Sequence, residues 1–247
     1  MPRIKNLTLT SGPQRPPCKV PHNVPALVFS AGGYTGNFFH DFNDGFIPLF
    51  ITVHTIFPDQ DFVIVVSEAP NWWPSNRKEA EGRSILNQEQ VIRLIKKVGF
   101  DVVVFKPKNK TPLNESYALL NSSHAMVGVH GAALTHSLFL RPGAVLVQVV
   151  PIGVEWAAYA FFGRVAKGLN LQYSEYKIGV EESSLVNKYG KGSLLVKDPF
   201  ALQKTGWDPE IMDIYLKEQN VKLDLIRFKA CLKKAYIKAK RFMEANG

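Results

Sequence analysis

Apolar residues along this chain form two kinds of pattern. Five short runs are almost uninterrupted and have the length of buried strands: Ala26–Ser30, Asp61–Ala69, Phe100–Phe105, Ala125–His130 and Ala144–Val150. Longer stretches place apolar residues three and four positions apart, as one face of a helix requires: a segment from about Asn37, then Asn87–Val98, Leu113–Ser123, Ala132–Leu140 and Val221–Phe242. Strands that alternate with helices predict an α/β fold with a parallel sheet and right-handed crossovers.

Local signals mark helix ends and a break in this rhythm. Asn87 and Gln90 are spaced as a capping box, and Gly99 is placed to end the helix that they begin. The stretch 70–84 contains two prolines, a glycine and a cluster of charges, which is typical of a linker. We therefore predict an N-terminal lobe over 1–74, a linker over 75–84, and a C-terminal lobe over 85–247 that ends in an amphipathic helix.

The charge of the chain is concentrated at its C-terminal end. The formal net charge is +9, and residues 221–247 alone contribute +6 of it. The rest of the chain is nearly neutral, so a nucleic-acid binder is not indicated, and the basic residues read as the solvated face of the last helix. Cys18 and Cys231 form no metal pattern and no disulfide framework. No stretch reaches the roughly 20 apolar residues of a membrane span, and the Met1 end does not resemble a signal peptide.

The run "VGVHGAALTH" places a small turn at the end of a predicted strand. In an open parallel sheet, ligands bind beyond the carboxyl ends of the strands. Free N–H groups of Ala132–Leu134 and the helix dipole suit a phosphate, Gly131 allows close approach of the backbone, and His130 can donate a hydrogen bond. The alternative is a glycine that merely permits a tight turn, beside a histidine satisfied by the backbone. The single glycine does not decide between them, because no Gly-x-Gly-x-x-Gly fingerprint is present.

Two further groups could carry chemistry. In "NFFHDFND", His40 and Asp44 are four apart on one helical face, where Asp44 could act as a general base beside the imidazole. The alternative is an exposed polar face above a Phe-rich core face. Glu181 and Glu182 are adjacent, but no second acidic cluster accompanies them at ligand spacing, so a catalytic metal is not indicated. Gly-x-Ser-x-Gly is also absent, which leaves a nucleophile-elbow hydrolase without support.

Three longer motifs occur in an order that points to a known family. "FSAGGYTGNFFHDFNDGFIPLFIT", "MVGVHGAALTHSLFLRPGAVLVQVVP" and "EYKIGVEESSL" together resemble the plant family 61 glycosyltransferases, closest to the grass members that decorate xylan with arabinosyl or xylosyl groups. The resemblance runs from about Pro25 to the end of the chain and includes "MDIYLKEQNVKLDL". It implies a GT-B-like fold of two Rossmann-like lobes with the active site in the cleft between them. It also implies inverting, metal-independent transfer from a UDP-sugar by a protein anchored in the Golgi membrane, on the lumenal side, with no cofactor.

The resemblance also implies roles for individual residues. The His-x-Phe-x-Asp pattern corresponds to His40, Phe42 and Asp44, with Asp44 as the base that takes the proton of the acceptor hydroxyl. The His-Gly-Ala turn corresponds to His130, Gly131 and Ala132, in the lobe expected to hold the nucleotide diphosphate. Two more donor-binding residues are implied: Arg83, from an arginine-bearing loop, and Glu155 in "PIGVEW", which is expected to reach the nucleotide or the sugar.

The chain departs from the family pattern in two places. The membrane anchor, stem and early part of the first lobe are expected before "PALVFS", so the N-terminal lobe is read as truncated. The family's long segment between "DFVIVVSEAPNWW" and "ILNQ", which supplies the first strand of the second lobe, shrinks here to "PSNRKEAEGRS". Loss of that strand leaves strand edges unpaired. One hypothesis is that Phe62–Val66 fills the gap and creates one fused sheet.

Three functions therefore stand side by side. The first is a UDP-pentose-dependent glycosyltransferase acting on xylan, with a UDP-sugar donor and a glycan acceptor as partners. The second is a catalytically inactive shortened family member that retains at most nucleotide binding. The third is a basic module that binds acidic polymers through the C-terminal helix, which salt-sensitive polyanion binding would reveal.

Overall fold

The computed structural model describes residues 20–29, 36–66, 82–107, 111–204, 206 and 208–246, together with Pro13 and Pro17. The chain divides into two compact units, one within residues 1–78 and one within residues 79–107 and 111–247. The division falls inside the stretch 75–84 that the sequence predicts as a linker, of which 75–81 lie outside the described residues. The roles predicted for the two parts as lobes stay predictions.

The first unit is a small strand–helix–strand arrangement. Its two strands pair in parallel, with Ala26 opposite Val63 and Phe29 opposite Val66. The helical segment between them begins directly after Asn37, as predicted, and the Asn37 side chain accepts a hydrogen bond from the N–H of Phe39. The elements are β1 (Ala26–Phe29), α1 (Phe38–His40), the π-helical stretch η1 (Asp41–Phe46), α2 (Ile47–Ile56) and β2 (Val63–Val66).

Apolar side chains of this unit remain exposed. Phe50 and Ile51 on α2 are 63% and 57% exposed, and Ile64 on β2 is 45% exposed. Two four-residue strands and one helical segment do not cover both faces of an apolar sheet. The described part of this unit therefore has little core of its own.

The second unit contains a three-stranded parallel sheet in the order β3-β4-β5. The strands are β3 (Ala125–Val129), β4 (Val145–Val150) and β5 (Gln172–Lys177). All six residues of β4 are buried, because β4 pairs on both edges and is covered on both faces. The predicted α/β class with parallel sheets is confirmed.

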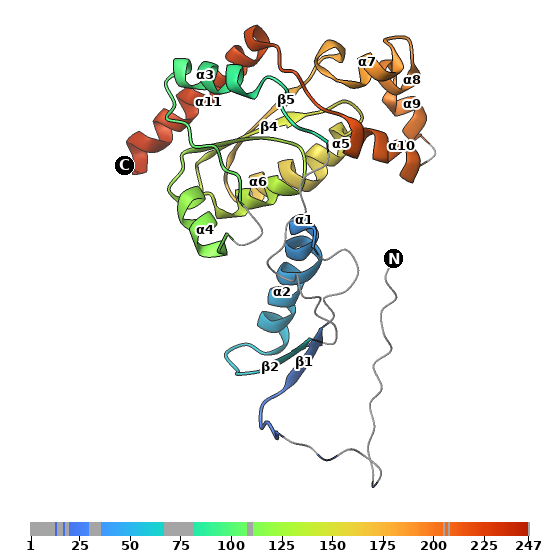
Figure 1. Cartoon of the computed structure of the whole chain (residues 1–247). Helices are drawn as coiled ribbons and strands as arrows, with labels where there is room; N and C mark the ends of the chain where they lie inside the picture. Colours follow the sequence, from blue (N-terminus) through green and yellow to red (C-terminus); the bar gives the residue numbers. More distant parts are fainter. Residues whose placement is uncertain are drawn as a thin grey trace. The chain divides into compact units, whose positions relative to one another are not determined.

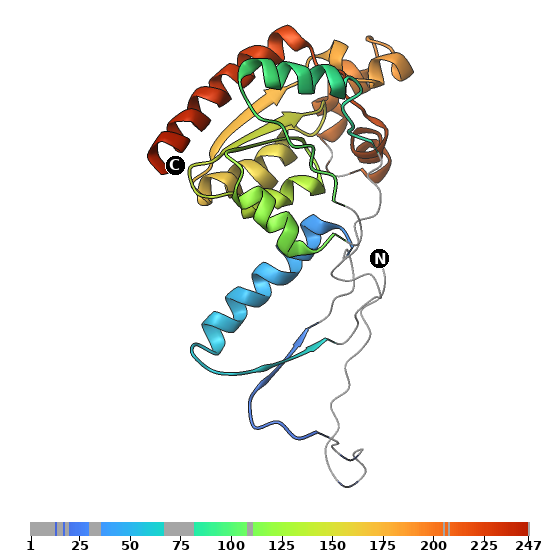
Figure 2. The same ribbon diagram turned by 60° about the vertical axis from the view of Figure 1, so that its left-hand side comes forward.

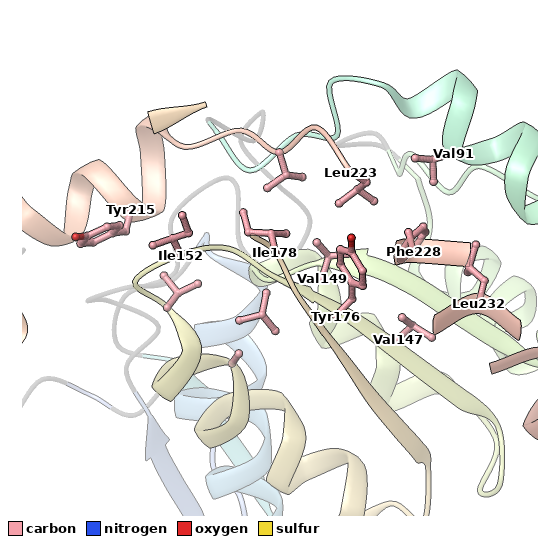
Figure 3. Packing of buried hydrophobic residues seen from close by; sticks show 14 of the residues in the cluster. Val91, Val147, Val149, Ile152, Tyr176, Ile178, Tyr215, Leu223, Phe228 and Leu232 are labelled. Atoms are coloured by element: carbon pink, nitrogen blue, oxygen red, sulfur yellow. The ribbon is translucent and has the colours of Figure 1, made fainter. Parts of the chain in front are cut away.

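Helices cover both faces of this sheet. The long helix α11 (Leu225–Asn246) lies beside α3 (Gln88–Val98) on one face, and α4 (Leu113–Asn121) and α6 (Arg164–Gly168) lie on the other (Figures 1 and 2). Figure 3 shows Phe228 and Leu232 of α11 against Val147, Val149 and Tyr176 of the sheet. The predicted amphipathic helix at the C-terminal end is thus confirmed, with a stripe of residues facing the core: Phe228, Leu232, Ala235, Ala239 and Phe242.

Short helical elements connect these layers. They are η2 (Ala132–Phe139), α5 (Glu155–Ala158), η3 (Tyr159–Gly163), η4 (Val180–Glu182), α7 (Leu185–Tyr189), α8 (Leu194–Lys197), α9 (Pro199–Gln203), α10 (Pro209–Asp213) and η5 (Ile214–Glu218). The stretch 194–218 follows β5 and supplies Val196, Met212 and Tyr215 to the core.

Two expectations about the sheets are wrong. The run Phe100–Phe105 is not a strand, and Val103 within it is 69% exposed. The hypothesis of one fused sheet fails as well, because β2 pairs with β1 and the strands β3-β4-β5 form a separate sheet. An apolar run becomes a strand only where another strand offers hydrogen bonds. None of the described residues offers them to Phe100–Phe105, so this run is not a strand.

The helix α3 also starts differently from the prediction. Asn87 is its N-cap residue, but its side chain makes no capping bond. Instead the Asn87 amide donates to the carbonyl of Leu223 at 2.9 Å and accepts from the N–H of Leu223 at 3.0 Å. The predicted capping box is therefore wrong, whereas Gly99 ends the helix in a left-handed conformation as expected.

The acidic pair of "GVEESSL" resolves into two different roles. Glu182 is 4% exposed, and four donors converge on its carboxylate. Oε1 accepts from the Tyr176 hydroxyl and the Asp224 N–H, both at 2.6 Å, while Oε2 accepts from the Gly179 N–H at 2.7 Å and from Arg227. Glu182 thereby ties the end of β5 to the start of α11, which is a structural role.

We expect Glu182→Gln to lower the free energy of unfolding by about 1–3 kcal/mol, because an amide turns one acceptor into a donor opposite existing donors. Glu181→Gln is the matched control, since Glu181 is 68% exposed and pairs only with Lys191 among the described residues; it is expected to change stability by about 0.5 kcal/mol or less. Urea unfolding of both variants measures the difference, and equal effects would contradict the assigned role.

Candidate functional site

The first group of predicted site residues lies at the carboxyl end of β3. His130 follows this strand directly, and its N–H donates to the carbonyl of Val149 on β4 at 2.9 Å. Its side chain is 4% exposed. The ring Nδ1 lies 2.8 Å from Nε2 of Gln148, and the ring edge meets Phe162 at a centroid distance of 5.5 Å. The imidazole is therefore held on two sides.

Gly131 brings the backbone close to an arginine. Its φ of 155° and ψ of 174° are sterically open to glycine, and a Cβ built there would lie 3.3 Å from the guanidinium carbon of Arg83. The helix predicted after this turn is η2, which is a 3-10 helix. Its Leu134 N–H donates to the Gly131 carbonyl at 2.9 Å, so the predicted free N–H groups reduce to those of Ala132 and Ala133, which precede this bond.

Arg83 is placed by a segment far away in the sequence. Gly82 and Arg83 both have left-handed backbone, with φ of 68° and 54°. A Cβ at Gly82 would collide with the Lys217 carbonyl, so glycine is required there. The N–H of Arg83 donates to the Gln219 carbonyl at 2.5 Å, and Ile85 forms a parallel bridge with Val221. Residues 217–221 thus fix the loop that carries Arg83.

Gln219 extends this support to the loop after β4. Its side chain is fully buried. Oε1 accepts from the Ile152 N–H at 3.0 Å and from the Ser183 hydroxyl at 2.9 Å, and Nε2 donates to the Ile152 carbonyl at 2.9 Å. One residue therefore contacts Arg83 through its backbone and the end of the central strand through its side chain.

The electrostatics of this group separate the roles of its two basic residues. Burial, with a smaller effect from the nearby Arg83 charge, lowers the pKa of His130 from 6.5 to about 3. The imidazole is neutral at ordinary pH and can offer a hydrogen bond but no charge. Of the three clustered residues Arg83, His130 and Gly131, the positive charge comes from Arg83.

Glu155 lies apart from these contacts. It is the exposed first residue of α5, and the interaction described for it is electrostatic, with Tyr215. Burial first, then the charges of Glu155 and Asp198, raises the pKa of Tyr215 to about 12. The donor-binding role of Glu155 stays a prediction.

The second predicted group lies in the first unit. His40 ends α1 and Asp44 lies in η1, and His40 Nδ1 is 2.5 Å from Asp44 Oδ2. The other carboxylate oxygen of Asp44 accepts from the Asn43 amide at 2.5 Å. The Asp44 side chain is 50% exposed. The predicted pairing is present, on a π-helical segment of the kind often found at functional sites.

The buried acid of this motif is a different residue. Asp41 is 6% exposed and accepts a hydrogen bond from the Gly36 N–H at 3.0 Å. Burial raises its pKa, and this outweighs the opposing effects of that hydrogen bond and of His40. Asp41 was not among the site residues predicted from the sequence, although it stands directly after His40 in the His-x-Phe-x-Asp pattern.

Two more residues at the His130 site were missed from the sequence. They are Gln148, a polar residue inside the otherwise apolar run of β4, and Tyr173 on β5, whose hydroxyl lies 2.6 Å from Gln148 Oε1. A buried amide in an apolar strand must find partners, and that need was a readable signal.

Neither a metal centre nor a membrane span emerges from the described residues. Within them, no three His, Cys, Asp or Glu side chains gather as a metal site. None of the helices described is both long enough and apolar enough to cross a bilayer.

We expect acid to destabilise the protein through His130. Its pKa is about 3 when folded and 6.5 ordinarily, so between these values the unfolded chain binds a proton that the folded chain does not. The contribution is present in full above about pH 6.5 and is lost as the pH falls toward 3, at up to about 1.4 kcal/mol per pH unit. The pH dependence of the unfolding free energy is expected to be shallower in His130→Gln, and parallel curves would contradict this.

Comparison with known proteins supports the resemblance that the sequence motifs predict. Residues 38–147 match the family model of Glycosyltransferase 61, a range that holds every predicted site residue except Glu155. The chain is 33% identical to xylan glycosyltransferase MUCI21 of Arabidopsis thaliana, covering 91% of this chain and 64% of the relative. It is 28% identical to the alpha-1,3-arabinosyltransferase XAT3 of Oryza sativa subsp. japonica, over 94% and 54%, and 29% identical to the beta-1,2-xylosyltransferase XYXT1 of the same species, over 95% and 68%.

This chain is shorter than the relatives that it matches. The chain spans between about half and two thirds of the length of these curated relatives. The match to the Arabidopsis protein extends over 319 positions, whereas 91% of this chain is about 225 residues, so about 94 positions have no counterpart here. This agrees with the internal segment expected to be missing. The predicted resemblance to the plant family 61 glycosyltransferases is confirmed.

Proposed function

We propose that this protein is an inverting glycosyltransferase that moves an arabinosyl or xylosyl group from a UDP-sugar to xylan. The match to the family model supports glycosyl transfer, and the names of the relatives above support pentose transfer to xylan. As a working arrangement, the two units act as the two lobes of a GT-B-like enzyme, in the lumen of the Golgi apparatus.

The observation that carries this proposal is the meeting of Arg83, His130 and Gly131 at the carboxyl end of β3. A departing UDP needs its negative charge stabilised. In the proposed complex, Arg83 pairs with the diphosphate, His130 donates a neutral hydrogen bond, and the N–H groups of Ala132 and Ala133 face the same anion. Arg83 takes the place of a metal ion, and Glu155 contacts the nucleotide or the sugar.

The acceptor is activated by the first unit in this proposal. The acceptor hydroxyl oxygen attacks the anomeric carbon from the side opposite UDP, so one carbon–oxygen bond forms as the bond to UDP breaks, with inversion. Asp44 takes the hydroxyl proton. His40 and Asn43 each hold one oxygen of the Asp44 carboxylate, which supports its orientation.

We expect titration calorimetry to show saturable binding of UDP to the full chain. Arg83→Met and His130→Ala each remove a proposed diphosphate contact and should weaken binding about 10-fold or more. Arg93→Met is the control, because Arg93 is exposed and its described partner is Glu89 on the same helix; its affinity should match the unsubstituted chain. A folded chain without UDP binding would overturn the proposal. Binding without sugar transfer would favour the inactive shortened family member.

We expect Asp44→Asn to lower the rate of pentose transfer to a xylan oligosaccharide by about 100-fold or more while leaving UDP affinity unchanged, since general base catalysis contributes about that factor. Asp59→Asn, which alters an exposed carboxyl of the same unit, is the control. If Asp41→Asn abolishes transfer and Asp44→Asn does not, the base assignment moves to the buried Asp41.

A further inference from the structure

The central strand β4 carries one amide in an apolar run. Gln148 is fully buried, and its neighbours Val147 and Val149 are buried as well. An amide without hydrogen bonds in such a place would cost about 1–3 kcal/mol of stability. A leucine would fill the position without that cost, so the presence of the amide calls for a reason beyond packing.

Both ends of the Gln148 amide have partners on the neighbouring strands. Nε2 lies 2.8 Å from Nδ1 of His130, at the end of β3. Oε1 accepts from the Tyr173 hydroxyl on β5 at 2.6 Å. The same hydroxyl lies 2.9 Å from Glu175 Oε1, but with Gln148 Oε1 only 2.6 Å away a hydroxyl proton must lie between these two oxygens, since their lone pairs would otherwise repel. A line of hydrogen bonds thus runs across the sheet from β5 through β4 to the candidate donor site.

The direction of these bonds fixes where His130 carries its proton. An amide nitrogen only donates, so Nδ1 of His130 must accept with its lone pair. Burial and Arg83 keep the imidazole neutral. A neutral imidazole with an unprotonated Nδ1 has its proton on Nε2. Within the described residues, Nδ1 is the ring nitrogen with a hydrogen-bond partner, so the Nε2–H is left for another acceptor.

We propose that Gln148 is a positioning residue that holds His130 in the Nε2–H tautomer, so that His130 donates to a diphosphate oxygen of the sugar donor. Tyr173 supports it by donating to Oε1, which orients the amide with its nitrogen toward His130. The opposite tautomer would present a lone pair to an anion and repel it. This inference rests on the proposed function of the His130 site.

Other groups around this line do not supply the same control. Arg83 acts on His130 through its charge, and its guanidinium is a donor only. Phe162 contacts the ring through an aromatic edge. Glu175 lies within hydrogen-bond distance of the Tyr173 hydroxyl, and both Glu175 and Tyr159 act on Tyr173 electrostatically. Lys167 donates to the Tyr159 hydroxyl at 3.1 Å. Among the described residues, Gln148 is the group that makes a hydrogen bond to a ring nitrogen of His130.

The tautomer is measurable in the full chain by long-range proton–nitrogen NMR of ¹⁵N-labelled histidines, with the His130 signal identified by its loss in His130→Gln. We expect the Nε2–H pattern in the unsubstituted protein. In Gln148→Glu, whose carboxylate only accepts, we expect the Nδ1–H pattern together with UDP affinity lowered about 10-fold or more. Gln148→Met, uncharged and similar in length, separates the loss of the donor from the added charge and should show both tautomers with weakened UDP binding.

Tyr173→Phe gives a second route should substitution of Gln148 prevent folding. It leaves Gln148 in place and removes the anchor, so a mixed tautomer signal is expected. An Nδ1–H pattern in the unsubstituted protein overturns the proposal, and so does an Nε2–H pattern with unchanged UDP affinity in both Gln148→Met and Tyr173→Phe. An Nε2–H signal that Gln148→Met abolishes, in a chain that does not bind UDP, supports the positioning role while contradicting the proposed function.

Discussion

The second unit depends on the complete burial of β4. A strand with no exposed residue must have both edges hydrogen-bonded and both faces covered, and here β3 and β5 supply the edges while α11 and α6 lie on opposite faces. Anything polar in such a strand has to be satisfied by specific partners. That constraint brings Gln148, His130 and Tyr173 into one line, because their strands are neighbours in the sheet.

Contacts between segments far apart in the sequence also position Arg83, the positive charge of the candidate donor site. Gly82 and Arg83 are two successive left-handed residues, and backbone contacts to residues 217–221 hold this part of the chain. The motif "KEQNVKLDL" therefore acts as scaffolding: its Gln219 reaches both Arg83 and the loop that follows β4. Glu182 makes a second connection, because its carboxylate accepts from Tyr176 on β5 and from the N–H of Asp224 just before α11.

In the candidate donor site, one residue supplies the positive charge and another supplies a neutral hydrogen-bond donor. Arg83 provides the cation, whereas His130 is kept neutral and oriented. A neutral donor of fixed direction favours an anion only in one geometry, while a flexible cation would attract it from many. The two acids of the first unit also differ from each other. Asp41 is buried, whereas Asp44 is half-exposed and each of its carboxylate oxygens has a hydrogen-bond partner. Two acids three positions apart in one helical segment thus have different environments.

The sequence by itself determined which segments are strands and helices wherever local pattern and neighbours agree. The apolar runs at Val63–Val66, Ala125–Val129 and Val145–Val150, the Asn37 and Gly99 helix boundaries and the long C-terminal helix all follow from periodicity and caps. The family motifs located His130, Gly131 and Asp44, since spacing within one turn or one helix is a local property. Arg83 was located by its place in the motif alone.

Only the tertiary structure decided the rest. Val102–Phe105 has the composition of a strand and is irregular, because a strand exists only where a neighbour supplies hydrogen bonds. Asn87 serves Leu223 across the fold instead of capping its own helix. The supporting roles of Gln148, Tyr173 and Gln219 join residues between 18 and 67 positions apart in the chain. Such partnerships depend on which strands become neighbours, and local periodicity carries no record of that choice.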